Sequence, residues 1–431
     1  LPSLKKEVKA LFDMGTFELV RRSDMQKLGK KPKKMKNVYK IKVNKDNEID
    51  KYKTRMVVQG FSLLPNDEYY DSYSSVIAAG NTRMLMYIAT QTGEDLSMAD
   101  VGNAYLEAEL PEDEVVFVEQ HPDTAVDGYP PKDWVLRLKK CLYGLPQAGR
   151  EYQRVYDKMM KRLGFVQIDA EDCLYVKNDP KHGRIICGNY VDDLLCLTHS
   201  TYLRDEWRTA LKKEFAKVTF EDDMDFILGI KIKRGKDKLG RNYVELDHQV
   251  AIEKVAEAAG IDEAFKPVLT PMSHSLKLHK KTEGEDDESL YVPKYEYARV
   301  LGGIMYVANV SRPDLITGVN KLSRYVTNPS HTHYKVLTKL VAHAYQTRDR
   351  CLRYTQVPHD QEHDPFRLRA ASDSSYADCP DTGRSTIGGC LWMGSETNGL
   401  IDWRSAMPKT VAQSTAEAEV QAAIETTKDI L

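Results

Sequence analysis

Two adjacent aspartates, Asp192 and Asp193, interrupt the apolar run Tyr190-Val191-Asp192-Asp193-Leu194-Leu195. Burying an unpaired carboxylate is costly, so the run is not one continuous buried strand. Residues 184–190 and 194–197 each have the composition of a short buried strand. Because neighbouring side chains on a strand point to opposite faces, the two aspartates can serve one site only at a turn. We therefore predict a β-hairpin with both aspartates at or near its turn; a solvated Asp-Asp turn is the alternative.

A third carboxylate, Asp100, follows the short apolar segment 96–99. One carboxylate from one strand and two from a neighbouring hairpin form the ligand set of a two-metal phosphoryl-transfer site. Carboxylate oxygens suit Mg²⁺, which keeps waters and substrate phosphates in its other positions, and Mn²⁺ is a candidate substitute. Asp100, Asp192 and Asp193 are therefore the predicted catalytic residues and ligands of two Mg²⁺ ions.

The length of 431 residues predicts two to four compact units. A hydrophobic content of 42% and a charged content of 29% are typical of soluble globular proteins, and no segment suggests a membrane span or a signal peptide. The seven cysteines show no Cys-x-x-Cys spacing, which favours reduced intracellular thiols over disulfides or a zinc site. Because the first residue is Leu1 rather than Met, we expect a piece of a longer precursor.

The net charge of −2 argues weakly against a nucleic-acid partner, but the charges are unevenly distributed. The segment 27–42 contains eight lysines and no acidic residue, whereas residues 283–288 are acidic apart from one glycine. A lysine run can be a solvated face or a phosphate-binding segment. The position of this run before the next motif favours phosphate binding.

Hydrophobic periodicity predicts helices and hairpins that together indicate an α+β architecture. The predicted helices cover 3–12, 83–92, 151–163, 203–215, a stretch from 250 onward, 295–309, 313–326 and 333–347. The predicted hairpins join 38–43 to 52–58 and 225–232 to 243–246, and the last segment, 368–431, begins with strands and ends in a helix.

Six motifs in a consistent order resemble the reverse transcriptase and ribonuclease H portion of Ty1/copia-type LTR retrotransposon polyproteins. Each motif alone has low specificity, whereas the ordered set covers the chain from about residue 5 to its end. The motifs are the fingers motif at 51–61, the first catalytic motif at 99–106, the nucleotide-side motif at 142–148, the Tyr190-Val191-Asp192-Asp193 signature, the connection segments 311–315 and 322–325, and the ribonuclease H segments 372–373, 384–386 and 414–419.

The resemblance implies a right-hand polymerase of fingers, palm and thumb, a connection region, and a partial ribonuclease H-like α/β domain. The implied boundaries are 1–246 for fingers and palm, 247–290 for the thumb, 291–366 for the connection region and 367–431 for the ribonuclease H-like part.

The resemblance also implies roles in binding the incoming nucleotide. Tyr105 would be the steric gate that excludes a ribose 2′-hydroxyl, with an ordinary core tyrosine as the alternative. Gln147 would contact the nucleotide sugar or the minor groove, and a structural glutamine at a helix start is its alternative. Arg55 would stack on the base and hold phosphates, since a planar guanidinium can do both. Lys51 and Lys53 are both candidates for the triphosphate, because alternate strand residues share a face.

Further roles concern the metal and the primer. The Val101 backbone is a predicted additional metal contact. Residues 226–232 resemble a primer grip, a hairpin that steers the primer end toward the metals, in which Leu228 and Gly229 contact the primer. The apolar residues there could equally be core. Tyr190 is expected beneath the primer terminus, with a core aromatic as the alternative.

The ribonuclease H resemblance assigns a second set of metal ligands to Asp373 and Glu419, with Glu417 as the runner-up for the second. The third and fourth carboxylates of the family would lie beyond the last residue of this chain. Asp429 falls well off the helical face of Glu419 and is a poor substitute. We therefore expect an incomplete ribonuclease H site with little or no activity on hybrids.

The implied function is RNA- and DNA-directed DNA polymerisation, which copies retrotransposon RNA into cDNA. The implied partners are an RNA template, a DNA or tRNA primer, an RNA–DNA hybrid, dNTPs and a second copy in a homodimer, with no membrane. The implied location is intracellular, in cytoplasmic particles, with the nucleus as a later site. A non-catalytic nucleic-acid-binding or assembly protein derived from a retroelement is the alternative, and a nuclease without polymerase activity would need a completed carboxylate cluster near Asp373.

Overall fold

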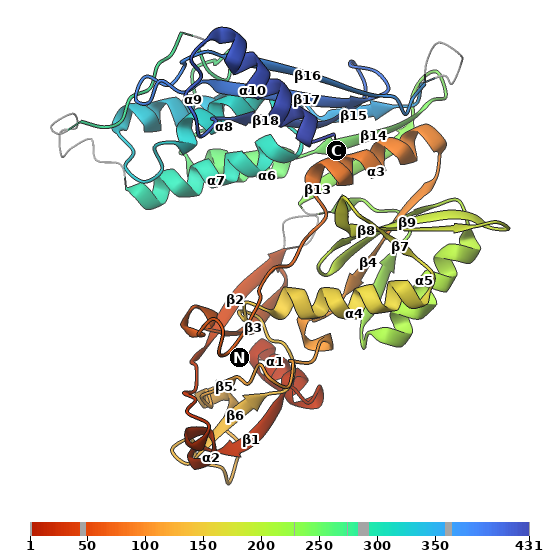
Figure 1. Cartoon of the computed structure of the whole chain (residues 1–431), viewed down its shortest axis with the longest axis vertical. Coiled ribbons are helices and arrows are strands. Elements are labelled where there is room, and N and C mark those ends of the chain that lie inside the picture. The colour runs from red at the N-terminus through yellow and green to blue at the C-terminus, as the bar shows by residue number, and fades with distance from the viewer. Residues whose placement is uncertain are drawn as a thin grey trace. The chain divides into compact units, whose positions relative to one another are not determined.

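The computed structural model describes residues 2–43, 49–227, 229–273, 275–282, 293–357 and 364–430. The chain forms two compact units, which agrees with the predicted number (Figure 1). Unit 1 comprises residues 1–77 and 97–221, and unit 2 comprises residues 78–96 and 222–431. Each unit combines helices with antiparallel strands, so the predicted mixed helix–strand class is confirmed.

Unit 1 is built around a six-stranded sheet in the order β11-β4-β10-β9-β8-β7, with a three-stranded sheet β1-β6-β5 and the hairpin β2-β3. Its helices and strands are α1 (Pro2–Asp13), β1 (Phe17–Arg21), α2 (Arg22–Lys27), β2 (Met35–Val43), β3 (Ile49–Val58), β4 (Asp95–Val101, which begins in unit 2), β5 (Phe117–Val118), β6 (Trp134–Leu138), α4 (Ala148–Arg162), β7 (Val166–Ile168), β8 (Glu171–Asp179), β9 (Gly183–Tyr190), β10 (Asp193–Thr198), α5 (Thr201–Glu214) and β11 (Val218–Glu221).

The apolar faces of α4 and α5 make the core of unit 1. Tyr152, Tyr156 and Met159 recur at helical spacing on α4, while Leu203 and Trp207 lie one turn apart on α5, and all five are buried. They belong to one hydrophobic cluster with inward-facing residues of the six-stranded sheet. This packing supports β4, β9 and β10, the strands on which the predicted catalytic residues lie.

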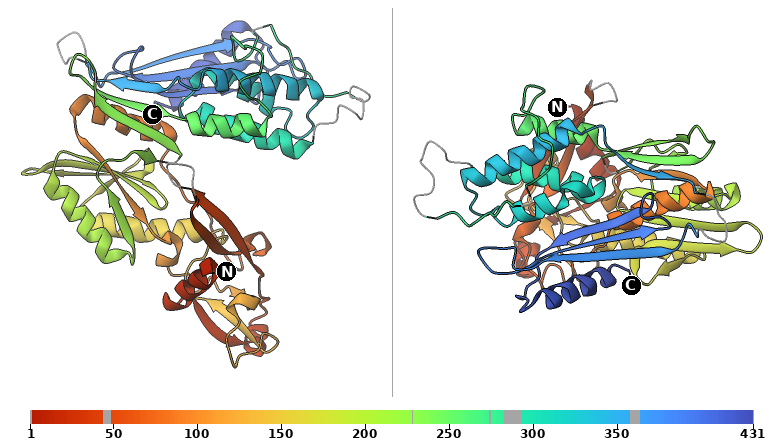
Figure 2. Two further views of the ribbon diagram at one scale, coloured as in Figure 1. Left: turned by 180° about the vertical axis from the view of Figure 1, so that it is seen from behind. Right: turned by 90° about the horizontal axis from the view of Figure 1, so that it is seen from above.

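Unit 2 contains a four-stranded sheet β12-β13-β14-β15, a three-stranded sheet β16-β17-β18 and a group of helices. Its elements are α3 (Ala79–Thr92), β12 (Phe226–Ile227), β13 (Ile230–Lys236), β14 (Asn242–Asp247), α6 (Gln249–Ala258), α7 (Lys294–Val310), α8 (Ile316–Ser323), α9 (His331–Gln346), β15 (Leu352–Thr355), β16 (Leu368–Ser375), β17 (Thr386–Met393), β18 (Leu400–Ala406) and α10 (Thr415–Lys428). Helices α6 to α9 share one apolar core, and α10 lies along β16 and β17 (Figure 2).

Most predicted elements are confirmed, with shifted ends. Helix α3 begins four residues earlier than the predicted start and ends at Gly93, which is left-handed as expected of a helix C-cap. Residues 225–232 form two short strands rather than one, because Gly229 has φ +83° and β12 pairs antiparallel with β13. The hairpin expected of the primer-grip segment 226–232 is therefore confirmed. The hairpin between β13 and β14 is confirmed. The turn at 46–48, the acidic loop 283–288 and Leu228 lie outside the described residues.

The predicted boundaries after residues 246, 290 and 366 do not coincide with the divisions between the compact units, and the functional names of the regions stay predictions. Residues 78–96, which lie inside the predicted fingers and palm region, belong to unit 2. Across the residues that the structure covers, no helix has both the length and the apolar character needed to cross a bilayer.

Candidate active site

The predicted turn at the paired aspartates is confirmed. Tyr190 at the end of β9 pairs with Asp193 at the start of β10, which leaves Val191 and Asp192 as a two-residue turn. Val191 has φ +55°, and two-residue hairpin turns of types I′ and II′ need a left-handed first residue. A β-branched residue rarely adopts this conformation, which costs on the order of 1–3 kcal/mol. The turn that carries Asp192 is therefore strained.

Strand β4 places Asp100 beside this turn. It neighbours β10 in the sheet, and the Val101 amide donates a hydrogen bond of 2.9 Å to the backbone oxygen of Asp192. The side chain of Val101 is buried, whereas Asp100, Asp192 and Asp193 are half-buried. Two carboxylate-bearing strands thus meet at one end of the sheet.

The buried Tyr152 phenol lies within the electrostatic reach of two of these carboxylates. Burial raises its pKa well above the usual value, and the negative charges of Asp192 and Asp100 raise it further. These two carboxylates therefore share one environment next to the core. Asp193 begins β10 opposite Tyr190 in the hairpin register.

The donor set suits a hard cation. Mg²⁺ is commonly held by one or two carboxylates, with waters and substrate phosphates completing its octahedron. Asp100 on β4 and Asp192 in the neighbouring turn between β9 and β10 can supply two such carboxylates. In the part of the chain that the structure describes, no three His, Cys, Asp or Glu side chains are grouped closely enough to hold an ion by themselves. Asp100 and Asp192 fit such an ion through their carboxylate chemistry, with solvent and substrate oxygens in its remaining positions.

Arg55 on β3 lies over an aromatic pair close to Asp192. Its guanidinium carbon is 4.5 Å from the ring centroid of Tyr143, and the rings of Tyr143 and Tyr105 are 5.3 Å apart. Burial raises the pKa of Tyr105; the charge of Asp192 raises it further, and that of Arg55 lowers it. Arg55, Tyr105 and Asp192 were each predicted as site residues from the sequence. Tyr143 was missed, although it lies inside the motif at 142–148.

Two glycines allow this arrangement. The Val58 amide at the end of β3 donates to the backbone oxygen of Tyr143 at 2.8 Å. Gly144 has φ +92°, and a Cβ there would lie 2.1 Å from the Val58 oxygen. A Cβ on Gly60 would lie 1.8 Å from the Gly144 oxygen. Only glycine permits so close a backbone approach, which holds Tyr143 against Arg55.

The alternation along β3 places Lys51, Lys53 and Arg55 on one face, as predicted. Lys51 is exposed and Lys53 half-buried. Burial raises the pKa of Glu7 on α1, while the Met56 amide and the charges of Lys53 and Arg55 lower it. Lys53 and Arg55 thus lie near one carboxylate, and the choice between the two lysines as triphosphate ligand stays open.

Gln147 is fully buried as the residue before α4. Its amide nitrogen donates to the Glu68 backbone oxygen at 3.4 Å, whereas its Oε1 is buried without a hydrogen-bond partner in the described structure. The structure therefore places Gln147 beneath the surface, with an unused acceptor.

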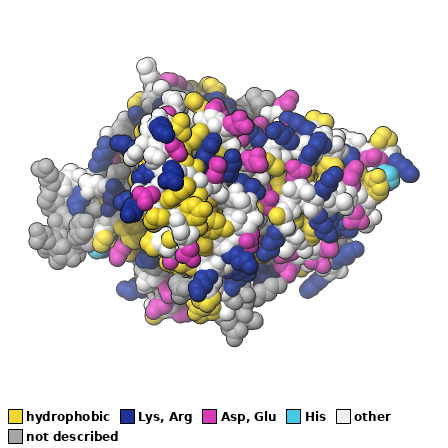
Figure 3. Space-filling view, turned by 90° about the horizontal axis from the view of Figure 1, so that it is seen from below, with side chains coloured by type: hydrophobic (Ala, Val, Ile, Leu, Met, Phe, Trp, Pro, Cys, Tyr) yellow, Lys and Arg dark blue, Asp and Glu magenta, His cyan; other side chains and the backbone are white. Residues whose placement is uncertain are grey.

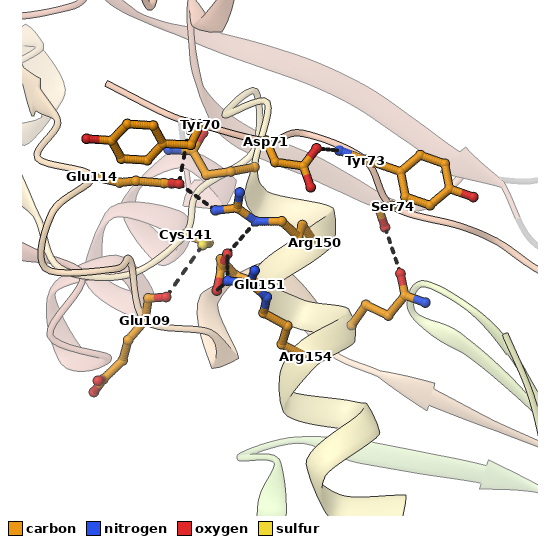
Figure 4. A network of polar contacts seen from close by, with 12 residues as sticks. Tyr70, Asp71, Tyr73, Ser74, Glu109, Glu114, Cys141, Arg150, Glu151 and Arg154 are labelled. Atoms are coloured by element: carbon orange, nitrogen blue, oxygen red, sulfur yellow. Dashed lines mark hydrogen bonds and ion pairs between the residues drawn. The ribbon is translucent and has the colours of Figure 1, made fainter. Parts of the chain in front are cut away.

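A buried ion-pair network fixes the start of α4 (Figure 4). Arg150 pairs with Glu114 at 2.6 Å and with Glu151 at 2.6 Å, and the Tyr70 amide donates to Glu114 at 3.3 Å. The side chain of Glu114 is 2% exposed. This network ties α4 to the loops before β5 and after β3, and so positions the adjacent residues 142–148.

The lysine-rich segment is partly neutralised by acidic residues. Lys27 pairs with Asp24, Lys30 with Asp67, and the buried Lys33 with Glu68, at distances of 2.6 to 2.7 Å. Figure 3 shows Lys and Arg side chains interspersed with acidic and hydrophobic ones on the face in view. These pairs weaken the case for a phosphate-binding run, because at least three of its lysines already have carboxylate partners.

The primer-contact candidates are distributed over both units. Tyr190 is half-buried in unit 1, Leu228 lies outside the described residues, and Gly229 belongs to unit 2. A Cβ on Gly229 would lie 3.0 Å from the hydroxyl of Tyr306 on α7. The turn between β12 and β13 is therefore supported closely by α7.

The ribonuclease H candidates lie on β16 and α10. Asp373 is exposed on β16, and the next residue, Ser374, donates from its hydroxyl to Glu419 at 2.7 Å. Glu417 instead accepts from the Gln413 amide at the start of α10. Asp429 pairs with Arg404. Glu419, the preferred candidate, thus contacts the strand that bears Asp373, although Asp373 itself points to the opposite face from Ser374.

Similar proteins place these observations in a family. Residues 14–274 match the family described as "Reverse transcriptase (RNA-dependent DNA polymerase)". The chain is 30% identical over 432 residues to the "Retrovirus-related Pol polyprotein from transposon TNT 1-94" of Nicotiana tabacum, with 100% of this chain and 31% of that protein covered. It is 29% identical over 397 residues to the "Retrovirus-related Pol polyprotein from transposon RE2" of Arabidopsis thaliana, covering 91% of this chain and 25% of that one.

A yeast relative shows the same pattern. The "Truncated transposon Ty1-A Gag-Pol polyprotein" of Saccharomyces cerevisiae is 25% identical over 428 residues, with 97% of this chain and 33% of the relative covered. The chain thus spans about a third or less of the length of these relatives. By its matched domain and its relatives, the chain belongs to the reverse transcriptase (RNA-dependent DNA polymerase) family found in Ty1/copia-type transposon Pol polyproteins.

Proposed function

We propose that this chain extends a primer on an RNA template, and also on a DNA template, with deoxynucleoside triphosphates. The observation that carries the proposal is the position of Asp100 on β4 beside the turn that carries Asp192, where the Val101 amide donates a 2.9 Å hydrogen bond to the Asp192 backbone oxygen. Family membership supports the polymerase class. The strained Val191 supports a functional turn, since backbone strain tends to occur at active sites.

In the proposed reaction, the primer 3′-hydroxyl oxygen forms a bond to the α-phosphorus of the nucleotide. The bond from that phosphorus to the bridging oxygen breaks, pyrophosphate leaves, and the hydroxyl proton passes to solvent. Such chemistry depends on positioning and charge stabilisation rather than on a protein nucleophile. Asp100 and Asp192 would hold the metal site, with Asp193 beside it. Two Mg²⁺ ions, when bound, would neutralise phosphate charge and favour the deprotonated hydroxyl.

Arg55, Tyr143 and Tyr105 would form the nucleotide side of the site. The stacked Arg55 and Tyr143 present a planar cation and a ring, which suit a phosphate and a base or sugar face. The contact of Tyr105 with Tyr143, and its closeness to Asp192, support a gate position next to the reacting groups. Gln147 would act by supporting the loop that presents Tyr143, because it is fully buried.

The test is primer extension on an RNA template with dNTPs and Mg²⁺. We expect extension by the unmodified chain and none by the Asp192→Asn, Asp193→Asn double variant. Asp169→Asn, which changes an exposed carboxylate near the outer edge of the same sheet, is the matched control and should retain activity. Template binding measured on the same preparations shows whether each variant is folded and competent to bind.

A second candidate is nucleic-acid binding without catalysis. A folded chain that binds template and primer but never extends the primer, with either Mg²⁺ or Mn²⁺, would support this candidate and exclude the polymerase.

A further inference from the structure

Helix α3 of unit 2 carries a fully buried arginine with an unusually complete set of partners. Arg83 is 2% exposed. Its Nε donates to the backbone oxygen of Ile401 at 2.6 Å, and its Nη1 donates to the oxygens of Asn309 and Val310 at 2.7 and 3.1 Å. Its Nη2 pairs with the Asp402 carboxylate at 2.8 Å. These bonds offset the cost of burying the cation.

The same guanidinium lies over the Trp403 ring, with its carbon 3.9 Å from the ring centroid. The Trp403 indole in turn donates to the Ala308 oxygen at 2.8 Å. Elsewhere on α3, the Tyr87 hydroxyl donates to the Pro365 oxygen at 2.9 Å. Helix α3 is therefore held by β18 and by the end of α7, elements that lie far downstream in the chain.

Both ends of α3 connect directly to the strands of the proposed polymerase site. Ile77, just before the helix, donates from its amide to the Asn189 oxygen of β9 at 3.0 Å. On the other side, α3 leads through Gly93 into β4, which contains Asp100. Arg234 on β13 donates to the Leu96 oxygen within β4 at 3.1 Å. The helix thus precedes β4, which carries Asp100, and follows Ile77, which contacts the end of β9 just before the turn with Asp192.

We propose that Arg83 is a positioning residue for DNA polymerisation. It acts through its contacts with Ile401, Asp402 and Trp403 of β18. On this proposal, which rests on the proposed function, the C-terminal segment contributes to the polymerase by fixing α3, independently of any hydrolysis. Fixing α3 sets where β4 places Asp100 relative to Asp192. Arg83 touches neither substrate nor metal.

Loss of Arg83 should affect kcat and the KM for dNTP differently. Strand β4, which follows α3 in the chain, carries Asp100, whereas Arg55 lies on β3 and Tyr143 on the 142–148 loop, both within unit 1. Loss of Arg83 should therefore lower kcat and leave the KM for dNTP nearly unchanged. Misplacing reacting groups by about 1 Å can cost about 100-fold in rate, so we expect a 10- to 100-fold fall in kcat.

The experiment compares the unmodified chain with Arg83→Met, which removes the charge and the donors but keeps the length of the side chain. Arg83→Lys restores the charge but not the fork of donors and should recover kcat only in part. The matched control is Arg312→Met in the same unit. Arg312 is similarly buried, at 3% exposed, and pairs with Asp314 at 2.7 Å, but its guanidinium contacts Asp314 and Thr347 rather than α3.

Single-nucleotide addition on a primed RNA template gives kcat and KM, and hydrogen exchange follows the Val101 amide, which bonds to Asp192. Lower kcat with faster Val101 exchange in Arg83→Met, but not in Arg312→Met, is the expected result. Asp402→Asn, a milder change that removes only the charge of the Arg83 partner, should also lower kcat and speed Val101 exchange.

Three results would overturn the proposal: an unchanged kcat in folded Arg83→Met, equal losses in both arginine variants, or a rise in KM alone. An inactive unmodified chain in the same assay would instead refute the proposed function. If Arg83→Met does not fold, Asp402→Asn and Arg83→Lys provide the test.

Discussion

The buried His248 predicts a specific loss of stability in acid. It precedes α6 in unit 2 and is 3% exposed. Its Nδ1 lies 2.5 Å from the Ser311 hydroxyl, and its Nε2 is buried without a hydrogen-bond partner in the structure as described. Burial lowers the pKa of His248 to about 4, with a partly opposing effect from Asp247. The imidazole is therefore neutral in the folded protein at neutral pH.

The size of this loss of unfolding free energy follows from the difference between the pKa values of His248 in the folded and unfolded states. A histidine in an unfolded chain has a pKa of about 6.5, so below this pH the unfolded state binds more protons than the folded state. The stabilisation is complete above about pH 6.5 and is lost progressively as the pH falls toward about 4. With these two pKa values, lowering the pH from 7 to 5 should cost about 2 kcal/mol of unfolding free energy from this group alone.

The assay compares the unmodified chain with His248→Asn, whose amide can keep the bond to Ser311 without gaining a charge. Hydrogen exchange of the α6 and α7 amides in increasing urea measures opening of unit 2, which a single global transition of a two-unit chain would not isolate. The difference in opening free energy between the two proteins should change by about 2 kcal/mol between pH 7 and pH 5.

The control is His199→Gln, which removes an exposed histidine of unit 1. This variant should retain the full pH dependence of unit 2. If His248→Asn shows the same acid sensitivity as the unmodified chain, the reasoning from burial is refuted. Because His248 packs edge-on to Tyr306, which lies against Gly229, protonation should also loosen the hairpin of β12 and β13.

Three further changes test unit 1. Arg150→Met leaves a buried carboxylate unpaired and should lower the opening free energy of α4, measured by hydrogen exchange of its amides, by about 3–5 kcal/mol. Lys161→Met, at an exposed pair on the same helix, should lower it by at most about 1 kcal/mol. Gly144→Ala should raise the KM for dNTP or prevent folding, whereas Gly128→Ala, with a similar φ of +83° but open space around it, should do neither. Tyr105→Ala should reduce discrimination against ribonucleotides by about 10-fold or more, measured as a ratio of kcat/KM values.

The sequence predicted features that depend on local patterns. The turn at Asp192 followed from charges inside an apolar run, and the end of α3 followed from Gly93, because a left-handed C-cap is a local preference. The hairpin around Gly229 followed from the resemblance to a primer grip and not from periodicity, since an apolar strand pattern continues on both sides of it. The pairing of Lys33 with Glu68 was also missed, because a charge run shows no partner from another part of the chain.

The candidate site shows the same division. Asp100, Asp192, Arg55 and Tyr105 were identified from short motifs, but their convergence depends on strand order, which periodicity does not determine. One hydrogen-bond partner of Arg83, the backbone oxygen of Ile401, lies 318 residues downstream. Nothing around α3 in the sequence distinguishes Arg83 from a solvated helical arginine. Long-range anchors of buried charges are therefore the class of feature that required the structure.

The strain at Val191 links the local and the long-range parts of the site. Glycine or asparagine would adopt φ +55° at lower cost, so the local preference of the turn alone does not explain a valine there. The valine side chain packs against the core of unit 1, and the Val101 amide holds the following residue, Asp192, from the neighbouring strand. Apolar packing and this inter-strand bond together can stabilise the strained turn in one conformation. A rigid turn would hold the Asp192 backbone next to Val101, the residue that follows Asp100, which would serve the proposed chemistry because that chemistry depends on positioning.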